Sequence, residues 1–301
     1  MRTPDNLMNM HQVTLPIETK EGLRLDPSEA RGLGDLLALD YASATPFPHI
    51  VMDGFLPEEV IRKARAGFPS QMLKSDRVFD MQYAGQQKRQ ILPEECDPST
   101  RDMFYFFNSK PILQFLEGLT GISGLIPDPY FSGGGYHEIS RGGLLGIHAD
   151  FRVHNELNLE RRLNLLVYLN DPWDESWGGK LELWDREMKH CERAISPLLN
   201  RCVVFSTDAE SFHGHPDPLA TPEGITRKSI ALYYYTASRA VYGEVPNYST
   251  MYYARPGDSK ANRGQAFWLR FDERLKDWLP LRMAQALSLR RRRLMGQRNK
   301  R

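Results

Sequence analysis

Cysteine is scarce in this chain, with three residues at positions 96, 191 and 202 of 301. They are too few and too scattered for a disulfide framework or for a metal site built on cysteine pairs. Long hydrophobic runs are lacking too: no stretch reaches the ~18 apolar residues of a membrane helix. The first residues, "MRTPDNLMNMHQVTLP", lack the apolar segment of a secretory signal. We therefore expect a cytoplasmic protein that does not enter the membrane.

Excess charge of one sign is also absent. Lysine and arginine total 39 against 38 aspartates and glutamates, which leaves a net charge of +1. A protein so nearly neutral has no field that would attract nucleic acid or a membrane surface. We expect neither as a partner, and the sequence leaves the oligomeric state open. The length suits one large β-rich domain with flanking helices, or two small domains.

Helix signals dominate up to Gly121. Residues 1–45 are expected to form an extension with one helix, because Asp26 can cap it, Pro27 suits the first turn and Glu29 suits a capping box. "TPFPHIVMDGFL" then predicts a strand. Three further helices are expected, in "PEEVIRKARAGF" before Pro69, in "DPSTRDMFYFFN", and in "SKPILQFLEGLTG" up to Gly121.

After Gly121 the pattern changes to short apolar or alternating runs separated by Gly, Pro, Asp and Asn. Strands are expected in "GGYHEIS", "LLGIHADF", "RRLNLLVYLN", "GKLELWD", "RCVVFSTD" and "KSIALYYYT". Many short strands with turn signals favour a sandwich, jelly roll or closed barrel. We therefore predict an α+β protein whose core is mainly β. From about residue 240 the chain becomes irregular, then helical, and it ends in a basic tail.

The stretch "GGLLGIHADF" sets His148 and Asp150 two positions apart. Alternate residues of a strand point to one face, so both side chains can face a barrel interior. Two histidines and one carboxylate on one face of a metal suit redox-active iron, with positions left for substrate and oxygen. The second histidine would be His213 in "SFHGHPDP", with His215 as its competitor. The alternative is that His148 and Asp150 are ordinary hydrogen-bonded polar residues.

Two later strands carry polar residues on one face. In "RRLNLLVYLND", alternation places Asn164 and Tyr168 together, with Leu163, Leu165 and Val167 on the other face. In "GITRKSIALYYYT", Arg227 and Ser229 share a face, and a guanidinium matches carboxylate geometry. Between these strands, "WGGKLELW" allows a sharp turn into a strand. Taken singly, Tyr168 can be a core tyrosine and Arg227 a solvated charge at a strand end.

The motifs follow one another in the order His148-x-Asp150 (the HxD pair), "YLN", the glycine pair, the later histidine and "RKS". This order resembles that of the Fe(II)- and 2-oxoglutarate-dependent dioxygenases, most of all of their prolyl 4-hydroxylase-like branch. The similarity spans about residues 130–237, and "PFPHIVMDGFL" near residue 46 is also typical. The resemblance implies a double-stranded β-helix, a jelly-roll, cupin-like barrel with flanking helices. It implies an oxygenase domain at 46–240, between an N-terminal extension (1–45) and a C-terminal one (241–301).

The resemblance also implies roles for individual residues. His148, Asp150 and His213 would be the catalytic iron ligands, and Arg227 would bind the distal carboxylate of 2-oxoglutarate. The remaining residues of the cosubstrate pocket would be Tyr168, Ser229 and Asn164. With Fe(II), 2-oxoglutarate and O2, such an enzyme hydroxylates an unactivated C–H bond and releases succinate and CO2. Related halogenases have a small residue where this chain keeps Asp150, which favours hydroxylation over halogenation.

The substrate is expected to be a small molecule, an amino acid or a prolyl or peptidyl group. Prolyl hydroxylases carry a tyrosine on the strand before the HxD pair, where this chain has Glu138 or Ile139, with Tyr136 slightly earlier. Candidates for contact with the substrate or support of the ligands are His215, His137, Arg152 and His154. For Arg152 and His154, just after the HxD pair, the alternative is a solvated loop.

Two other hypotheses remain open. In the first, the chain is a non-catalytic β-barrel binding module that holds a structural metal or none. Structural zinc prefers four protein ligands, often including cysteine, and Cys202 lies on the strand leading to His213. In the second, the basic run Arg290–Arg293 binds RNA, acidic lipid or an acidic partner, although such a run is more often a solvated tail.

Overall fold

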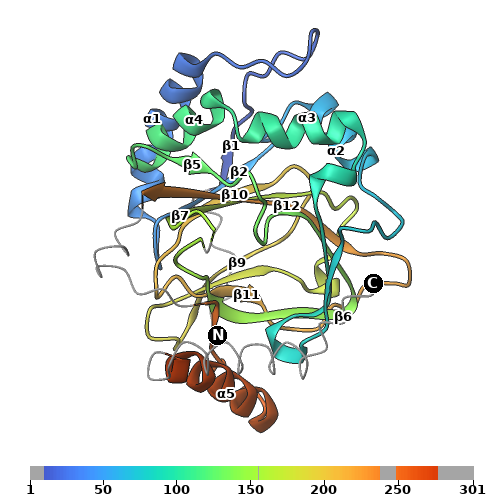
Figure 1. The fold of residues 1–301 in the computed structure, drawn as a ribbon, viewed down its shortest axis with the longest axis vertical. Coiled ribbons are helices and arrows are strands. Elements are labelled where there is room, and N and C mark those ends of the chain that lie inside the picture. The colour runs from blue at the N-terminus through green and yellow to red at the C-terminus, as the bar shows by residue number, and fades with distance from the viewer. Residues whose placement is uncertain (1–9, 155, 238–248, 277–301) are drawn as a thin grey trace.

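The computed structural model describes residues 10–154, 156–237 and 249–276. Its strands form two facing layers (Figure 1). In the main layer, hydrogen-bonded neighbours follow the order β1 (Met10–Gln12), β2 (His49–Asp53), β10 (Cys202–Ser206), β7 (Leu159–Tyr168), β12 (Arg227–Ala237) and β6 (Gly135–Ala149). Beyond β6 lie β4 (Gln86–Ile91) and β3 (Arg77–Phe79), and β5 (Ile126–Pro127) pairs with β12.

The second layer starts from the other half of the same long strand β6. There β6 pairs with β11 (His213–His215) and β13 (Met251–Tyr252), and β11 leads on to β8 (Leu181–Trp184) and β9 (Cys191–Ile195). Strand β6 therefore belongs to both layers and joins them along one side. The predicted fold, a mainly β double-stranded β-helix with flanking helices, is confirmed.

Helices cover the outer face of the main layer (Figure 1). They are α1 (Pro27–Ser43), α2 (Glu58–Ala66), α3 (Pro98–Phe107) and α4 (Lys110–Thr120), while α5 (Lys260–Lys276) lies at the opposite end of the molecule. Short 3-10 turns occupy Gln82–Ala84, Pro93–Glu95 and Glu175–Trp177. As predicted, Asp26 caps α1 by accepting from the backbone N–H groups of Ser28 and Glu29.

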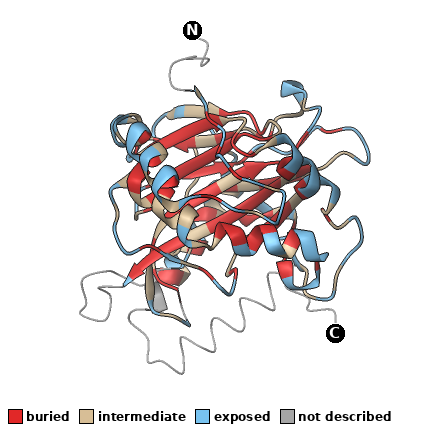
Figure 2. Ribbon diagram, turned by 90° about the horizontal axis from the view of Figure 1, so that it is seen from above, coloured by how far each residue is buried: buried red, intermediate tan, exposed pale blue. Residues whose placement is uncertain are grey.

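Two hydrophobic cores lie on opposite faces of the main layer. The outer core packs the helices against residues such as Leu163, Leu165 and Val167. The inner core lies between the layers and includes Tyr168 and Phe205. Figure 2 shows the strands buried while the helices expose their outer sides. The predicted alternation along β7 is therefore confirmed, and Tyr168 faces the barrel interior.

The structure differs from the predicted strands in two respects. "GGYHEIS" and "LLGIHADF" are parts of the single strand β6, which passes through Gly142 at a φ of 77° that glycine adopts readily. Strands β3 and β4 were not predicted, because "QQKRQI" carries polar residues on both faces. The limits proposed for the domain and its two extensions stay a prediction.

The C-terminal helix predicted from "FDERLKDWLPLRMAQALSLRRRRL" is present in part as α5. Residues 277–301, with the basic run, lie outside the described residues. None of the helices in the described parts of the chain is long and apolar enough to cross a membrane.

Candidate metal centre

Strands β6 and β11 bring three possible metal ligands together. His213 lies directly opposite His148 in the antiparallel pair, and Asp150 follows β6 by one residue. One ligand atom from each of His148, Asp150 and His213 can be chosen so that all three lie within 4.8 Å of one another, and all three residues are buried. Within the described residues, no other group of three such side chains converges in this way.

Backbone carbonyl groups orient both imidazole rings. Nδ1 of His148 is 2.8 Å from the Gly146 oxygen, and Nδ1 of His213 is 2.9 Å from the Ser211 oxygen. Because a carbonyl can only accept, each Nδ1 carries the proton and each Nε2 presents its lone pair. The two Nε2 atoms are 3.7 Å and 3.5 Å from carboxylate oxygens of Asp150. The centre therefore offers two neutral nitrogens and one carboxylate.

Asp150 is held through one of its two oxygens. Oδ2 accepts a hydrogen bond of 2.8 Å from the Asn164 amide and lies 3.0 Å from Nη2 of Arg161. Burial alone would raise the pKa of Asp150, but above all the positive charge of Arg161 holds it well below its usual value. The carboxylate is thus ionised, with Oδ1 free of such donors. This donor set fits Fe(II), which imidazole and carboxylate ligands suit.

Protonation of His213 does not compete with metal binding near neutral pH. Burial, together with the neighbouring His148, lowers the pKa of His213 to about 4. A histidine must be neutral to bind a metal.

Gly214 lets β11 approach β6 closely, because a Cβ at this position would lie 2.8 Å from the Leu145 oxygen.

His215, the competitor of His213, is not part of the group of three ligands. It is 4% exposed, and neither ring nitrogen has a hydrogen-bond partner among the residues that the structure describes. Burial lowers its pKa well below the ordinary value, helped by Arg227 and Lys88. His215 is therefore a buried, neutral imidazole.

Arg227 of β12 points into the barrel. Its Nε donates to the Gly179 carbonyl at 2.8 Å, and its Nη2 donates to the Tyr168 hydroxyl at 3.3 Å. Gly179 has a φ of 71°, and a Cβ there would lie 3.1 Å from Cδ of Arg227. The glycine pair, read from the sequence only as a turn, thus also anchors this arginine. Ser229 pairs with Tyr168 and lies on the same face.

The other predicted site residues are bound within the protein. Nε2 of His137 is 2.7 Å from the Gly133 oxygen, and Arg152 donates to Glu160 at 2.8 Å. His154 is 1% exposed, and its Nδ1 accepts from two backbone N–H groups of its own loop. Asn164 contacts Asp150, although it was predicted for the cosubstrate pocket. Their roles towards cosubstrate or substrate stay predictions.

Arg161 was not singled out from the sequence. It is 1% exposed, and its guanidinium lies 3.5 Å from the centroid of the Tyr233 ring. Strict alternation from Asn164 would turn Arg162 inward instead. The pairing of β7 with β12 shifts by one residue between Tyr234 and Tyr235, which brings Arg161 opposite Tyr235. The shift reverses the faces at this end of β7.

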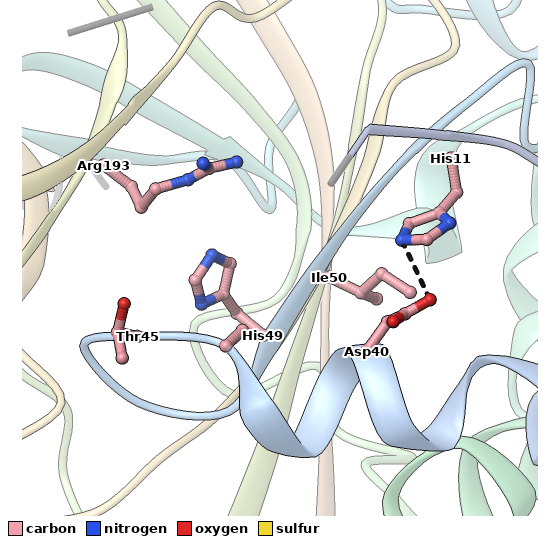
Figure 3. Close-up of a pocket in the computed structure, with 7 residues that line it drawn as sticks. His11, Asp40, Thr45, His49, Ile50 and Arg193 are labelled. Atoms are coloured by element: carbon pink, nitrogen blue, oxygen red, sulfur yellow. Dashed lines mark ion pairs between the residues drawn. The ribbon is translucent and has the colours of Figure 1, made fainter. Parts of the chain in front are cut away.

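A second group of titratable residues lies beside α1, away from the three ligands. His11, Asp40, His49 and Arg193 line a small pocket (Figure 3). His11 pairs with Asp40 at 3.6 Å, and His49 lies 2.9 Å from the Phe47 carbonyl through Nδ1. Burial lowers the pKa of His49. The geometry does not gather metal ligands there.

Comparison with known proteins identifies the class of this site. Residues 134–235 match the model of the 2OG-Fe(II) oxygenase superfamily. This segment contains His148, Asp150, His213 and Arg227. No curated protein matches the sequence.

Several solved structures are similar. A Pseudomonas putida prolyl-4-hydroxylase is 17% identical, over 68% of this chain and 99% of its own, with a TM-score of 0.49. A prolyl 4-hydroxylase from Phytophthora capsici is 16% identical, over 87% and 79%, with a TM-score of 0.44. HygX from Streptomyces hygroscopicus, solved with nickel, 2-oxoglutarate and hygromycin B, is 11% identical, over 66% and 86%, with a TM-score of 0.44.

The family match confirms the resemblance found in the sequence. Residues 134–235 form a 2OG-Fe(II) oxygenase domain, and the chain is a 2-oxoglutarate-dependent Fe(II) dioxygenase. Its cofactor is Fe(II), and it uses 2-oxoglutarate and O2.

Proposed function

We propose that this oxygenase hydroxylates an unactivated C–H bond of a small molecule, an amino acid or a prolyl or peptidyl substrate. The observation that carries the proposal is the convergence of His148, Asp150 and His213, with both imidazole Nδ1 atoms bound to backbone carbonyls. These three residues would hold the iron and leave positions for cosubstrate and oxygen. When bound, iron supplies oxygen activation coupled to the conversion of 2-oxoglutarate into succinate and CO2.

Arg227 and Tyr168 would bind the distal carboxylate of 2-oxoglutarate. The Arg227 guanidinium is fixed by the Gly179 carbonyl through Nε, which leaves its Nη groups to face the barrel. The Tyr168 hydroxyl, 3.3 Å from Nη2, is a second donor at the same place. A guanidinium fork with an adjacent hydroxyl suits a carboxylate, and Ser229 lies on the same face.

The residues around the ligands exclude water. Phe205 packs against His213 with ring centroids 4.7 Å apart, and Tyr252 packs against His148 at 5.5 Å. A dry site strengthens the electrostatic interactions inside it and protects reactive species from side reactions. Asp150, kept ionised by Arg161, supplies the single negative charge among the three ligands.

Two features argue against a structural zinc site in a non-catalytic module. The ligand group contains three residues, whereas structural zinc prefers four. Cys202, the candidate for a fourth ligand, packs in the outer core of the main layer and is fully buried there. Its side chain is on the opposite face of β10 from the barrel interior.

The test is turnover of 2-oxoglutarate by the Fe(II)-loaded protein under oxygen, together with a search for products that gain one oxygen atom in a pool of metabolites and peptides. We expect succinate from the wild type and none from His148→Ala or Asp150→Ala. His190→Ala, at an exposed histidine, is the matched control and should keep full activity. Unchanged turnover in His148→Ala would refute the proposed iron ligands.

A further inference from the structure

Lys88 of β4 lies outside the segment that matches the oxygenase family, yet it faces the barrel interior. Ile139 of β6 pairs with Lys88 on one side and with Arg227 on the other. Paired residues of neighbouring strands point to the same face of a sheet, so Lys88 shares a face with Arg227. Two strand spacings, about 10 Å, separate their backbones.

The Lys88 ammonium has no anionic partner. It lies 5.6 Å from the centroid of the Phe79 ring, but it donates no hydrogen bond and forms no ion pair with any residue that the structure describes. Burial lowers its pKa to about 8. The negative charge of Asp150 raises this pKa, whereas the positive charges of Arg227 and Arg161 lower it further. A partly buried ammonium without a partner is costly, and a bound anion would relieve that cost.

Charge pairing indicates which cation of the barrel is left for the substrate. Asp150 neutralises Arg161, to which it is bound, and the distal carboxylate of 2-oxoglutarate would neutralise Arg227. Because Arg227 and Tyr168 already form the cosubstrate's carboxylate site, the unmatched cation is Lys88.

We propose that the substrate carries an anionic group, a carboxylate or a phosphate, which Lys88 binds inside the barrel. This inference rests on the proposed function, because it assigns a substrate class to the same site. Lys88 acts as a binding residue that would set the position of the substrate relative to the metal.

The experiment uses protein loaded with Mn(II) and saturated with 2-oxoglutarate. The probes are acetate and inorganic phosphate, followed through the paramagnetic relaxation of the acetate methyl protons and of the phosphate phosphorus. We expect saturable relaxation with at least one probe. Affinity should fall about tenfold or more in Lys88→Met, as for loss of a hydrogen bond to a charged group, and should be largely kept in Lys88→Arg.

Lys228→Met is the matched control. Lys228 lies on β12, on the other side of β6 from β4, and is the strand partner of Glu138. Its ammonium lies 5.0 Å from the centroid of the Phe68 ring on the outer face. Its removal should leave probe affinity unchanged. Equal probe affinity in Lys88→Met and wild type would overturn the proposal, as would the absence of saturable relaxation with both anions.

A separate titration of 2-oxoglutarate by calorimetry distinguishes the possible failures. If the Mn(II)-loaded wild type does not bind 2-oxoglutarate, the proposed function itself fails. If Lys88→Met weakens the binding of 2-oxoglutarate as strongly as Arg227→Met does, Lys88 belongs to the cosubstrate site and the substrate assignment is wrong. We expect Lys88→Met to change 2-oxoglutarate affinity less than threefold, roughly 0.6 kcal/mol.

Discussion

Nη2 of Arg161 lies 3.0 Å from Oδ2 of Asp150, so a buried arginine is bound to one of the three possible metal ligands. Asn164 completes the contact, because it donates to the same carboxylate oxygen and accepts from Arg161 at 2.7 Å. Both donors use Oδ2, and Oδ1 is the oxygen that remains for a metal. The pair thus fixes the orientation of the carboxylate as well as its charge.

We expect Asn164→Ala to weaken metal binding by about 10–100-fold, because loss of a residue that supports a ligand has an effect of that size. The measurement is a Co(II) or Fe(II) titration under anaerobic conditions. Asn170→Ala is the control. This asparagine follows the same strand β7 but binds the Pro197 and Lys228 carbonyls, so its loss should lower thermal stability and leave metal affinity intact. Equal metal affinity in wild type and Asn164→Ala would contradict the orienting role.

Variants of the two histidines of "FHGHP" should differ in their affinity for the metal. His213→Ala removes one of three ligands and should abolish tight metal binding together with turnover. His215→Ala removes a side chain outside that group, and the protein should still bind the metal. If His215→Ala lost the metal while His213→Ala kept it, the pairing of β11 with β6 would be wrong.

Arg227 should control the affinity for 2-oxoglutarate. Arg227→Met should cost about 2–5 kcal/mol of binding free energy, the range for removing one partner of a buried, hydrogen-bonded charge pair. Metal affinity should be unchanged. The checks are the apparent 2-oxoglutarate constant and a calorimetric titration, with Lys228→Met as the control on the outer face. If the variant changed only the apparent constant for the substrate that is to be hydroxylated, and not that for 2-oxoglutarate, this role would be disproved.

Gly179→Ala should produce a milder form of the same defect. A Cβ there would lie 2.6 Å from Leu219 and 3.1 Å from Arg227, on a backbone with a φ of 71°. We expect a rise in the 2-oxoglutarate constant of about 3–10-fold, equivalent to strain of about 1 kcal/mol at a special backbone position. Gly178→Ala is the control, because a Cβ at Gly178 meets nothing within 4 Å. Similar constants in both variants would show that the Gly179 carbonyl does not position Arg227.

Lys88 should make the stability of the metal-free protein depend on pH. Its pKa falls from 10.5 to about 8 on folding, so between these values the unfolded chain binds more protons and stability rises with pH. Below pH 8, Lys88 is charged in the folded protein, and the full free-energy cost of burying the ammonium lowers the stability. Lys88→Met should therefore raise the free energy of unfolding at pH 7, by on the order of 2 kcal/mol, and the gain should shrink towards pH 10. Urea unfolding at both pH values checks this, and a gain that grew with pH would contradict it.

The sequence alone determined the local features of this site. The spacing of His148 and Asp150 predicted that both side chains lie on one side at the end of β6, and the alternation along β7 predicted that Tyr168 points inward. The capped helix α1 was predictable for the same reason, because Asp26 and the residues it caps are neighbours in the chain. Each of these features depends on residues a few positions apart, where the periods of helix and strand apply directly.

Only the tertiary structure decided the contacts that depend on strand pairing. The shift between β7 and β12 turned Arg161 inward, against the alternation of its own strand. Lys88 came to share a face of the sheet with Arg227 because β4 and β12 both pair with β6, over long separations in sequence. A shift of one residue in pairing exchanges the two faces of a strand. The short-range pattern therefore predicted the metal ligands, whereas the long-range register of the strands determined which cationic side chains lie near them.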